Sequence, residues 1–414
     1  MAPSDFTQFF LGCFLFSLAT RQWLKLRHIR HITQHREQVP AEFAERIALS
    51  AHQKAADYTV DRSRTALLEN LIDGGLLLAL TLGGGLAVLH AFWSAQLSGL
   101  SYGLAMIFSL MGISALIDLP LSLYRQFVVE ARHGFNRMTL RLFFSDLGKQ
   151  TALGLVIGTP LILAVLWLMA SMGEQWWLYV WLFWSAFNLL MLFIYPTWIA
   201  PLFNKFQPLE DGEMKQRIEA LLARCGFRSS GLFVMDGSKR SSHGNAYFTG
   251  FGKNKRIVFF DTLLSRLTPA ETEAVLAHEL GHFHHRHIVK RIALMFLSSL
   301  AFLWLLGQLI DASWFYTALG LPAQNTTLGL ILFFLVMPVF TFPLTPVGSL
   351  LSRRDEFEAD AYAAAHADRQ DLVRALVKLY EDNASTLTPD PLHSIFYDSH
   401  PPAAQRIAHL QEAT

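Results

Sequence analysis

Charged residues are scarce in this chain. Asp, Glu, Lys and Arg together make up 16% of its 414 residues, whereas an average soluble domain contains roughly 25%. Apolar residues make up 52%, so the composition indicates a protein that is partly embedded in lipid. The formal net charge is only +1, and this balance gives no indication of a nucleic-acid partner.

Cysteine is scarcer still. Cys13 and Cys225 lie far apart in the sequence, and two such residues exclude a disulfide-rich secreted scaffold. We interpret both as free thiols, which fits a reducing compartment for the soluble part of the protein. The apolar run at residues 6–20 has no basic leader and no clear cleavage site. We therefore expect a retained membrane span there rather than a signal peptide.

Lysine and arginine are absent from three long stretches, residues 65–124, 150–204 and 292–352, and from everything before Arg21. Each internal stretch is long enough for two membrane helices and a short turn, because one helix needs about 20 apolar residues. The apolar runs in and beside these stretches predict seven spans, near residues 6–24, 66–90, 102–124, 150–170, 176–199, 289–310 and 327–350.

This assignment places all 34 basic residues on one face of the membrane. The positive-inside rule then predicts that this face is cytoplasmic, with the N-terminus outside and the C-terminus inside. The alternative is that some of the runs are buried helices of a soluble protein. A soluble protein has no physical reason to sort its charges in this way, so the membrane interpretation is favoured.

The spans divide the chain into four parts. We expect a membrane domain at residues 1–199, the first part of a soluble domain at 200–288, a hairpin of two spans at 289–350 and the second part of the soluble domain at 351–414. Because the hairpin returns the chain to the same face, the two soluble parts can fold together.

Three polar residues, Asp73, Asp118 and Asn188, interrupt the apolar runs. Ionisable groups at membrane depth usually face a protein interior or a water-filled cavity. Equally, Asp73 and Asp118 can lie near an interface or cap a kinked helix, since Pro120 follows Asp118. The sequence leaves both interpretations open.

Residues 268–289, TPAETEAVLAHELGHFHHRHIV, predict a helix with a well-defined start. Thr268 suits the N-cap, and Pro269 suits the first helical position. Glu271 completes a capping box with Thr268. The helix should therefore extend through the five residues His-Glu-Leu-Gly-His.

The two histidines of this motif, His278 and His282, are one helical turn apart. Positions i and i+4 lie on one face of a helix, so both imidazoles can bind a single zinc ion. Glu279 lies beside them and can polarise a zinc-bound water as general base and acid. The alternative is a pair of histidines on a solvated helix face.

A catalytic zinc site needs a third protein ligand and an open position for water. We reject His285, because three ligands from one short helix crowd one side of a tetrahedral ion. Glu356 and Asp360 are four residues apart on a second predicted helix. Glu356 can bind the metal while Asp360 accepts the second ring N–H of a zinc-bound histidine. Glu358 points to the opposite side, and we expect it to be solvated.

The motif at residues 278–282, followed by Glu-x-x-Ala-Asp at 356–360, resembles the type I CAAX prenyl protease family of membrane-integral zinc endopeptidases. Residues 242–258, SHGNAYFTGFGKNKRIV, are similar to that family's substrate-binding edge segment. Ser399-His400-Pro401-Pro402 with Arg406 is similar to its C-terminal active-site motif. Seven spans also agree with the family, so the resemblance covers nearly the whole chain.

The resemblance implies a role for each matching residue. It implies zinc ligation by His278, His282 and Glu356, catalysis by Glu279 and an outer position for Asp360. It also implies that Asn245 and Ala246 hold the substrate backbone, and that His400 and Arg406 contact the substrate or the developing oxyanion.

Elementary chemistry agrees with these residue types. NAYFTGFG and the following RIVFFDTLL suggest two strands, and a strand edge can bind an extended peptide through main-chain hydrogen bonds. His400 can donate a hydrogen bond to the negative oxygen that forms on the attacked amide. By themselves, His400 and Arg406 are more typical of surface residues at a helix start, and Asn245 of a turn.

The run from His282 to His287 contains more histidine than catalysis requires. These residues can bind an additional or inhibitory metal ion, although solvated histidines are the more ordinary interpretation.

The sequence therefore predicts a mostly α-helical membrane protein with seven transmembrane helices and a zincin-like α+β cytoplasmic metalloprotease domain. The predicted function is Zn²⁺-dependent hydrolysis of peptide bonds, and the resemblance implies cleavage C-terminal to a prenylated cysteine. The predicted partners are the lipid bilayer and a peptide or protein substrate; whether the substrate is prenylated or membrane-associated is left open. The membrane would be the cytoplasmic membrane of a bacterium, which the short outer loops suit, or the endoplasmic reticulum of a eukaryote.

Three alternatives remain open. A membrane-protein quality-control protease would have the same chemistry without prenyl specificity. An intramembrane-cleaving protease would place its zinc helix within an apolar span, but Glu271, Glu273 and Arg286 flank the motif here. In a non-catalytic scaffold or transporter of the same fold, we would expect at least one metal-binding residue to be replaced. In this sequence, a suitable residue stands at every expected position.

Overall fold

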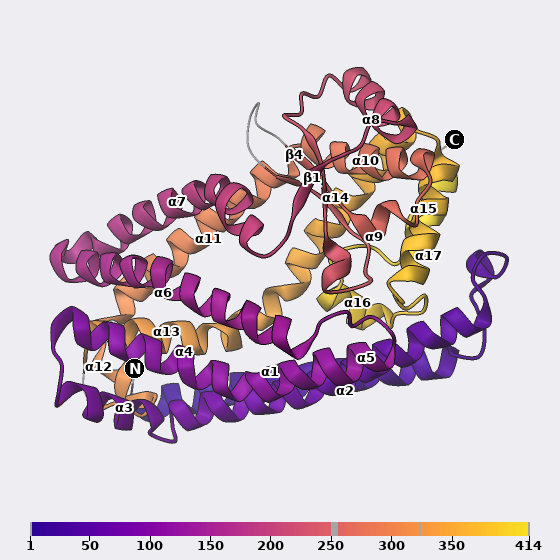
Figure 1. Cartoon of the computed structure of the whole chain (residues 1–414). Helices are drawn as coiled ribbons and strands as arrows, with labels where there is room; N and C mark the ends of the chain where they lie inside the picture. The colour runs from indigo at the N-terminus through magenta and orange to yellow at the C-terminus, as the bar shows by residue number, and fades with distance from the viewer. Residues whose placement is uncertain (1, 250–255, 323, 413–414) are drawn as a thin grey trace.

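The computed structural model describes residues 2–249, 256–322 and 324–412 (Figure 1). The first half of the chain consists of helices α1 (Pro3–His35), α2 (Leu49–Leu80), α3 (Gly85–Ser94), α4 (Gly99–Tyr124), α5 (Glu130–Arg132), α6 (Leu140–Ser171) and α7 (Trp176–Ile194). The middle holds β1 (Phe206–Pro208), α8 (Glu213–Arg224), β2 (Leu232–Met235), β3 (Ala246–Thr249), β4 (Arg256–Phe260), α9 (Asp261–Leu264) and α10 (Pro269–His284). The remainder is helical again, with α11 (His287–Leu309), α12 (Ser313–Ala318), α13 (Thr326–Thr341), α14 (Thr345–His366), α15 (Arg369–Asp382), α16 (Pro391–Tyr397) and α17 (Ala403–Glu412).

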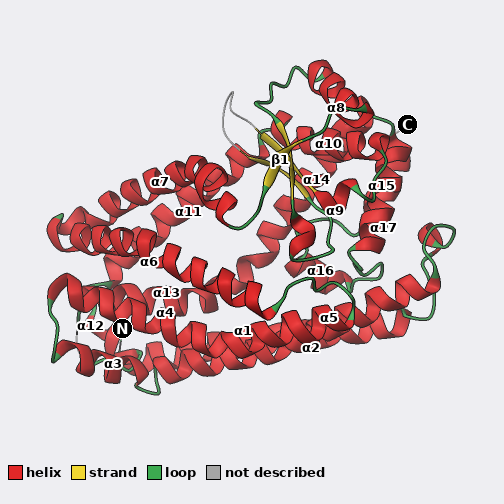
Figure 2. Ribbon diagram, in the orientation of Figure 1, coloured by secondary structure: helices red, strands yellow, loops and turns green. Residues whose placement is uncertain are grey.

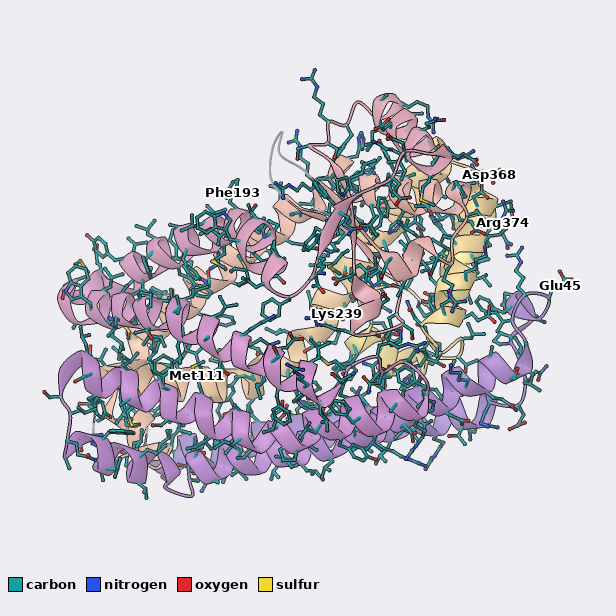
Figure 3. The ribbon with its side chains drawn as sticks, viewed as in Figure 1. Glu45, Met111, Phe193, Lys239, Asp368 and Arg374 are labelled. Atoms are coloured by element: carbon teal, nitrogen blue, oxygen red, sulfur yellow. The ribbon has the colours of Figure 1, made fainter. Side chains whose placement is uncertain are left out.

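The long helices form one body, and the strands lie in another at one end of it (Figures 1 and 2). Large apolar side chains on the long helices are exposed, among them Leu116, Val156 and Leu182. The labelled Met111 and Phe193 lie over the long helices, whereas the charged Asp368 and Arg374 lie at the other end of the molecule (Figure 3). Exposed apolar surface on such helices fits contact with lipid. This is an integral, multi-pass membrane protein.

Five helical stretches are long and apolar enough to cross a membrane: Gly99–Arg132, Leu140–Ser171, Gly173–Leu202, His287–Leu309 and Thr326–His366. A sixth crossing is possible if α2 and α3, which meet at a bend of 51°, count as one span. The break follows from Gly83, Gly84 and Gly85, and Gly84 has a φ of 78° that favours glycine. The first predicted span, at residues 6–24, would supply the seventh crossing. It lies in α1, which continues as a polar helix to His35. A count of seven therefore stays a prediction.

The polar residues of the apolar runs differ in their surroundings. Asp73 lines a cavity of ≈ 280 Å³ together with Arg21. Asp118 pairs with Arg125 at 3.2 Å, and the amide of Asn188 donates to the carbonyl of Trp184 within the same helix. Asp73 therefore fits the interpretation of a polar residue that faces a cavity.

The four strands form one small sheet in the order β1-β2-β4-β3. β2 and β4 are parallel, while β1 and β3 each pair antiparallel with a neighbour. The prediction of strands in segments 245–252 and 256–264 is confirmed for β3 and β4, although residues 250–255 lie outside the described part of the chain. It is wrong for the last four residues of the second segment, which form helix α9. β3 is the last strand in the order, so within the described residues its outer edge has no strand partner.

The soluble body is held together by apolar packing between distant segments. Leu276, Leu280, Ile257, Leu376 and Ile407 all belong to one buried cluster. The cluster joins α10 to the sheet, to α15 and to α17, and α14 packs along α10. As a result, the helices before and after the α11–α13 hairpin lie side by side.

Candidate metal centre and active site

Helix α10 begins as its sequence predicts. The Thr268 hydroxyl accepts a hydrogen bond from the backbone N–H of Glu271, and the Glu271 carboxylate accepts one from the backbone N–H of Thr268. Lys378 of α15 neutralises Glu271 at 2.7 Å. This cap fixes where the helix starts and therefore which residues of α10 face α14.

Three predicted metal ligands converge between α10 and α14. Nε2 of His278 lies 3.3 Å from one carboxylate oxygen of Glu356, and Nε2 of His282 lies 3.4 Å from the other. The three possible ligand atoms lie within 4.8 Å of one another. Glu356 is buried, and its Oε2, which faces His278 and lies 3.7 Å from Arg406, accepts no hydrogen bond from the residues that the structure describes. A buried carboxylate oxygen without a partner is costly unless a cation binds it, so these residues fit a metal ion.

Asp360 and Arg406 lie behind this set. Oδ1 of Asp360 lies 2.8 Å from Nδ1 of His278, so it can accept the second ring N–H of that histidine. The buried guanidinium of Arg406 donates to both oxygens of Asp360, at 2.8 and 2.6 Å, and lies 3.7 Å from Glu356. Arg406 is thus engaged by carboxylates, which favours a positioning role over the substrate contact that the resemblance implies.

His282 has a corresponding partner that the sequence analysis did not assign. Its Nδ1 lies 2.9 Å from Nδ1 of His287. Nε2 of His287 in turn lies 3.1 Å from the carboxylate of Glu358. With Nε2 facing Glu356, His282 can donate its Nδ1–H to His287, and His287 can donate its Nε2–H to Glu358. This arrangement leaves the lone pair on Nε2 of His282 directed at the metal position.

The backbone explains how His287 reaches this position. Helix α10 ends at His284, and Arg286 adopts a left-handed conformation with φ of 57° before α11 begins at His287. The turn folds His287 back against His282. The expectation of solvated side chains is therefore wrong for His287, which is 1% exposed, whereas Glu358 is 30% exposed and also contacts His287. His284 is exposed as expected, and His285, which we rejected as a ligand, lies outside the metal-binding group.

A second set of residues, His287, Asp355 and Glu358, also has the composition of a metal site. Its carboxylates already have cationic partners, because Arg291 lies 3.2 Å from Asp355 and Arg354 lies 3.1 Å from Glu358. We therefore interpret this set as a hydrogen-bonding network that supports His282.

Glu279 lies in a cavity of ≈ 310 Å³ beside the metal position. Burial raises the pKa of its carboxyl group. His400 lines the same cavity, with Nε2 3.3 Å from Glu356 and a side chain that is 61% exposed. A carboxylate with a raised pKa is suited to proton transfer near neutral pH, and an accessible imidazole can reach a bound substrate.

Asn245 and Ala246 line this cavity too. Ala246 begins β3, and the backbone carbonyl of Asn245 accepts a hydrogen bond from Phe260 of β4. The Asn245 side chain bonds to the next backbone N–H of its own chain, at 2.8 Å. The start of β3 therefore lines the same cavity as His278 and Glu279.

Comparison with known proteins agrees with this geometry. Residues 208–414 match Peptidase family M48, and residues 28–205 match "CAAX prenyl protease N-terminal, five membrane helices". This chain belongs to peptidase family M48. A CAAX prenyl protease 1 homolog from Arabidopsis thaliana is 41% identical over 73% of this chain and 72% of its own length. The CAAX prenyl protease 1 homolog from Homo sapiens is 35% identical over 95% of this chain and 91% of its own length.

A solved structure shows the same fold. The crystal structure of S. mikatae Ste24p superimposes with a TM-score of 0.92 at 31% identity, and the match covers 98% of both chains. Membership of M48 makes this chain a membrane metalloendopeptidase, and it implies zinc as the metal. Two histidines and one glutamate form a usual catalytic zinc set, with a fourth position left for water.

Proposed function

We propose that this metalloendopeptidase cleaves the C-terminal segment of prenylated CAAX proteins. Relatives named CAAX prenyl protease 1, or a homolog of it, match the chain over most of its length. The observation that carries the catalytic part is the convergence of His278, His282 and the buried, unpartnered Glu356 oxygen. It favours a hydrolase over a scaffold that has kept only the fold.

In this proposal His278, His282 and Glu356 hold the zinc ion. When bound there, zinc lowers the pKa of a water molecule to about 7 and polarises the substrate carbonyl. Glu279 takes a proton from the water and later delivers it to the leaving amine. His400 donates a hydrogen bond to the oxygen on which negative charge develops.

The substrate in this proposal is an extended peptide on the outer edge of β3. Its main chain pairs with the strand, and Asn245 and Ala246 hold it beside the catalytic residues. Support comes from the cavity that these two residues share with His278 and Glu279. The edge favours an extended peptide segment, whose main-chain groups are free to pair with the strand.

We further propose that α1 makes a seventh crossing, that the four-part division of the chain holds, and that the active site is on the cytoplasmic face. The distribution of Lys and Arg in the sequence supports this orientation. The soluble body would have the α+β arrangement of a zincin.

One experiment tests the substrate and the catalyst together. The chain is purified in detergent, its zinc content is measured, and cleavage of a farnesylated CAAX peptide is compared with that of its unprenylated twin. We expect about one zinc ion per chain, preference for the farnesylated peptide, and loss of activity in Glu279→Gln with the zinc retained. Equal cleavage of both peptides would instead indicate a quality-control protease. Activity in chains without zinc would contradict the mechanism.

A further inference from the structure

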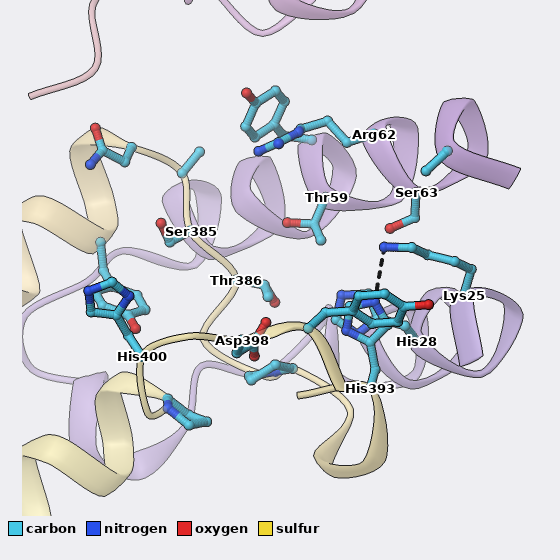
Figure 4. A pocket seen from close by; sticks show the side chains of 18 of the residues that line it. Lys25, His28, Thr59, Arg62, Ser63, Ser385, Thr386, His393, Asp398 and His400 are labelled. Carbon is cyan, nitrogen blue, oxygen red and sulfur yellow. Dashed lines mark hydrogen bonds between the residues drawn. The ribbon is translucent and has the colours of Figure 1, made fainter. Parts of the chain in front are cut away.

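A second cavity opens beside the active site. It has a volume of ≈ 480 Å³ and lies between α1, α2 and the segment from Tyr380 to Pro402 (Figure 4). Tyr380, Asn383, Ser385 and His400 line both this cavity and the one that holds Glu279. The two spaces therefore adjoin along these four residues, and a peptide that leaves the metal position can continue into the second.

The second cavity is lined by two cations, Lys25 from α1 and Arg62 from α2. The ammonium of Lys25 contacts Nε2 of His393 at 3.1 Å and lies over the ring of Tyr397. The guanidinium of Arg62 lies over the ring of Tyr58, 5.4 Å from its centroid. Within the described residues, neither cation forms an ion pair with a carboxylate.

Asp398 and Glu69 lie near enough to counter the lowering of the Lys25 pKa by burial, and Arg62 likewise interacts with Glu130, but at longer range than an ion pair. Two cationic side chains that line one cavity and are not ion-paired attract an anion.

One acidic residue, Asp398, lines the same cavity. Burial raises the pKa of its carboxyl group, and burial likewise lowers the pKa of the Lys25 ammonium. The cavity is thus lined by one carboxylate and by the two cationic side chains beside the catalytic residues.

The sheet indicates which end of a peptide reaches these cations. β3 already pairs antiparallel with β4, and antiparallel pairing is the slightly more stable arrangement for an added strand. A peptide that runs antiparallel along the outer edge of β3 directs its C-terminus toward Asn245. Beyond that end, Arg62 shares a third cavity of ≈ 530 Å³ with His243, Gly244 and Asn245. The C-terminal end of the peptide therefore points toward Arg62.

We propose that Lys25 and Arg62 bind the C-terminal carboxylate of the substrate. The inference rests on the proposed function and extends it, because it makes the free chain end a recognition element beside the prenyl group. The site of cleavage is then set by its distance from the carboxylate. A peptide with the same sequence but no terminal charge lacks this contact.

The test compares two farnesylated CAAX peptides that differ only at the end, one with a free carboxylate and one with a carboxamide. We expect zinc-loaded enzyme to cleave the acid with a kcat/KM at least about tenfold higher, since a hydrogen bond to a charged group contributes that much. Arg62→Gln and Lys25→Gln should each lower kcat/KM for the acid alone. The ratio of kcat/KM for the acid to kcat/KM for the amide should therefore fall toward one. Arg64→Gln, an exposed residue of α2 outside the cavity lining, should leave the ratio unchanged.

The results separate the inference from the proposed function. Cleavage of neither peptide would contradict the proposed function. Equal cleavage of both, or a ratio that neither substitution changes, would overturn only the carboxylate site.

A phospholipid phosphate can bind the same cations. If the substitutions alter the response to phosphatidylglycerol in vesicles but leave the acid-to-amide ratio intact, the site binds headgroups and the inference is wrong. Zinc content and cleavage of the amide show that each variant is folded.

Discussion

At the scale of the residue, the two histidines of the motif are held by different neighbours. Asp360 accepts the ring N–H of His278, and Arg406 holds Asp360 in place. His282 instead faces another histidine, His287. A neutral imidazole accepts a hydrogen bond less strongly than a carboxylate does, so this second contact depends on the carboxylates behind it.

We predict that His287→Ala lowers zinc affinity by about 10- to 100-fold, because partners that orient a ligating histidine typically contribute that much. Zinc affinity is measured by competition with a chelator. His284→Ala, an exposed histidine of the same run, serves as the matched control and should bind zinc normally. An unchanged affinity in the His287 variant would show that His282 is oriented by α10 alone.

The raised pKa of Glu279 gives a second prediction at this scale. Glu279 must be ionised to accept a proton, so activity is present above its pKa and is lost as the pH falls through it. We expect log(kcat/KM) to decline on the acid side at a pH above about 4.3, the ordinary pKa of a glutamate. Zinc content is measured at each pH, so that loss of metal is not mistaken for protonation. A decline at or below that value, with zinc bound, would contradict the assignment.

At the scale of the element, the site depends on how closely α10 and α14 approach. A Cβ atom at Gly281 would lie 2.8 Å from Cα of Ala359 and 3.0 Å from its carbonyl oxygen. These are backbone atoms that cannot move aside without moving the helix. Because Ala359 is between Glu356 and Asp360 on α14, any shift there moves a proposed zinc ligand and its support together.

We therefore predict that Gly281→Ala destabilises the protein by about 1–3 kcal/mol, the usual cost of overpacking, and reduces zinc occupancy. The measurements are thermal unfolding in detergent and zinc content. Gly348→Ala is the matched control, because a Cβ at Gly348 of α14 meets nothing within 4 Å. If both variants unfold and bind zinc alike, close packing at Gly281 is not required.

At the scale of the whole molecule, the proposed ligands come from both sides of the α11–α13 hairpin. His278 and His282 precede it, and Glu356 follows it. A contact between α1 and the C-terminal segment closes the molecule further, since Arg27 pairs with the buried Asp390 at 2.9 Å. Zinc that bridges α10 and α14 would therefore stabilise the arrangement of the soluble body around the hairpin.

We predict that chelation lowers the unfolding temperature of the purified protein, and that added zinc restores it. The folded state gains about 4 kcal/mol when free zinc is ~1,000 times its Kd. Glu356→Ala, which lacks one proposed ligand, should show a much smaller shift. A shift of equal size in both proteins would place the stabilising zinc elsewhere.

Some features were predictable because short-range rules decide them. Thr268 and Glu271 cap α10 whatever lies around them, and helix geometry alone brings His278 and His282 onto one face. Glu356 could be singled out because a catalytic zinc needs a ligand from outside the motif. The long apolar runs were visible from composition, since lipid requires uninterrupted helices.

Tertiary structure alone decided the rest. His287 follows the helix that bears His282, and only the left-handed turn at Arg286 brings the two rings together. Lys25 and Arg62 are 37 residues apart in the sequence and lie on two helices, so the cavity that they share depends on how α1 and α2 pack against the C-terminal segment. Sequence patterns report local periodicity and capping, whereas contacts between distant segments depend on how the apolar faces pack, which no single pattern encodes.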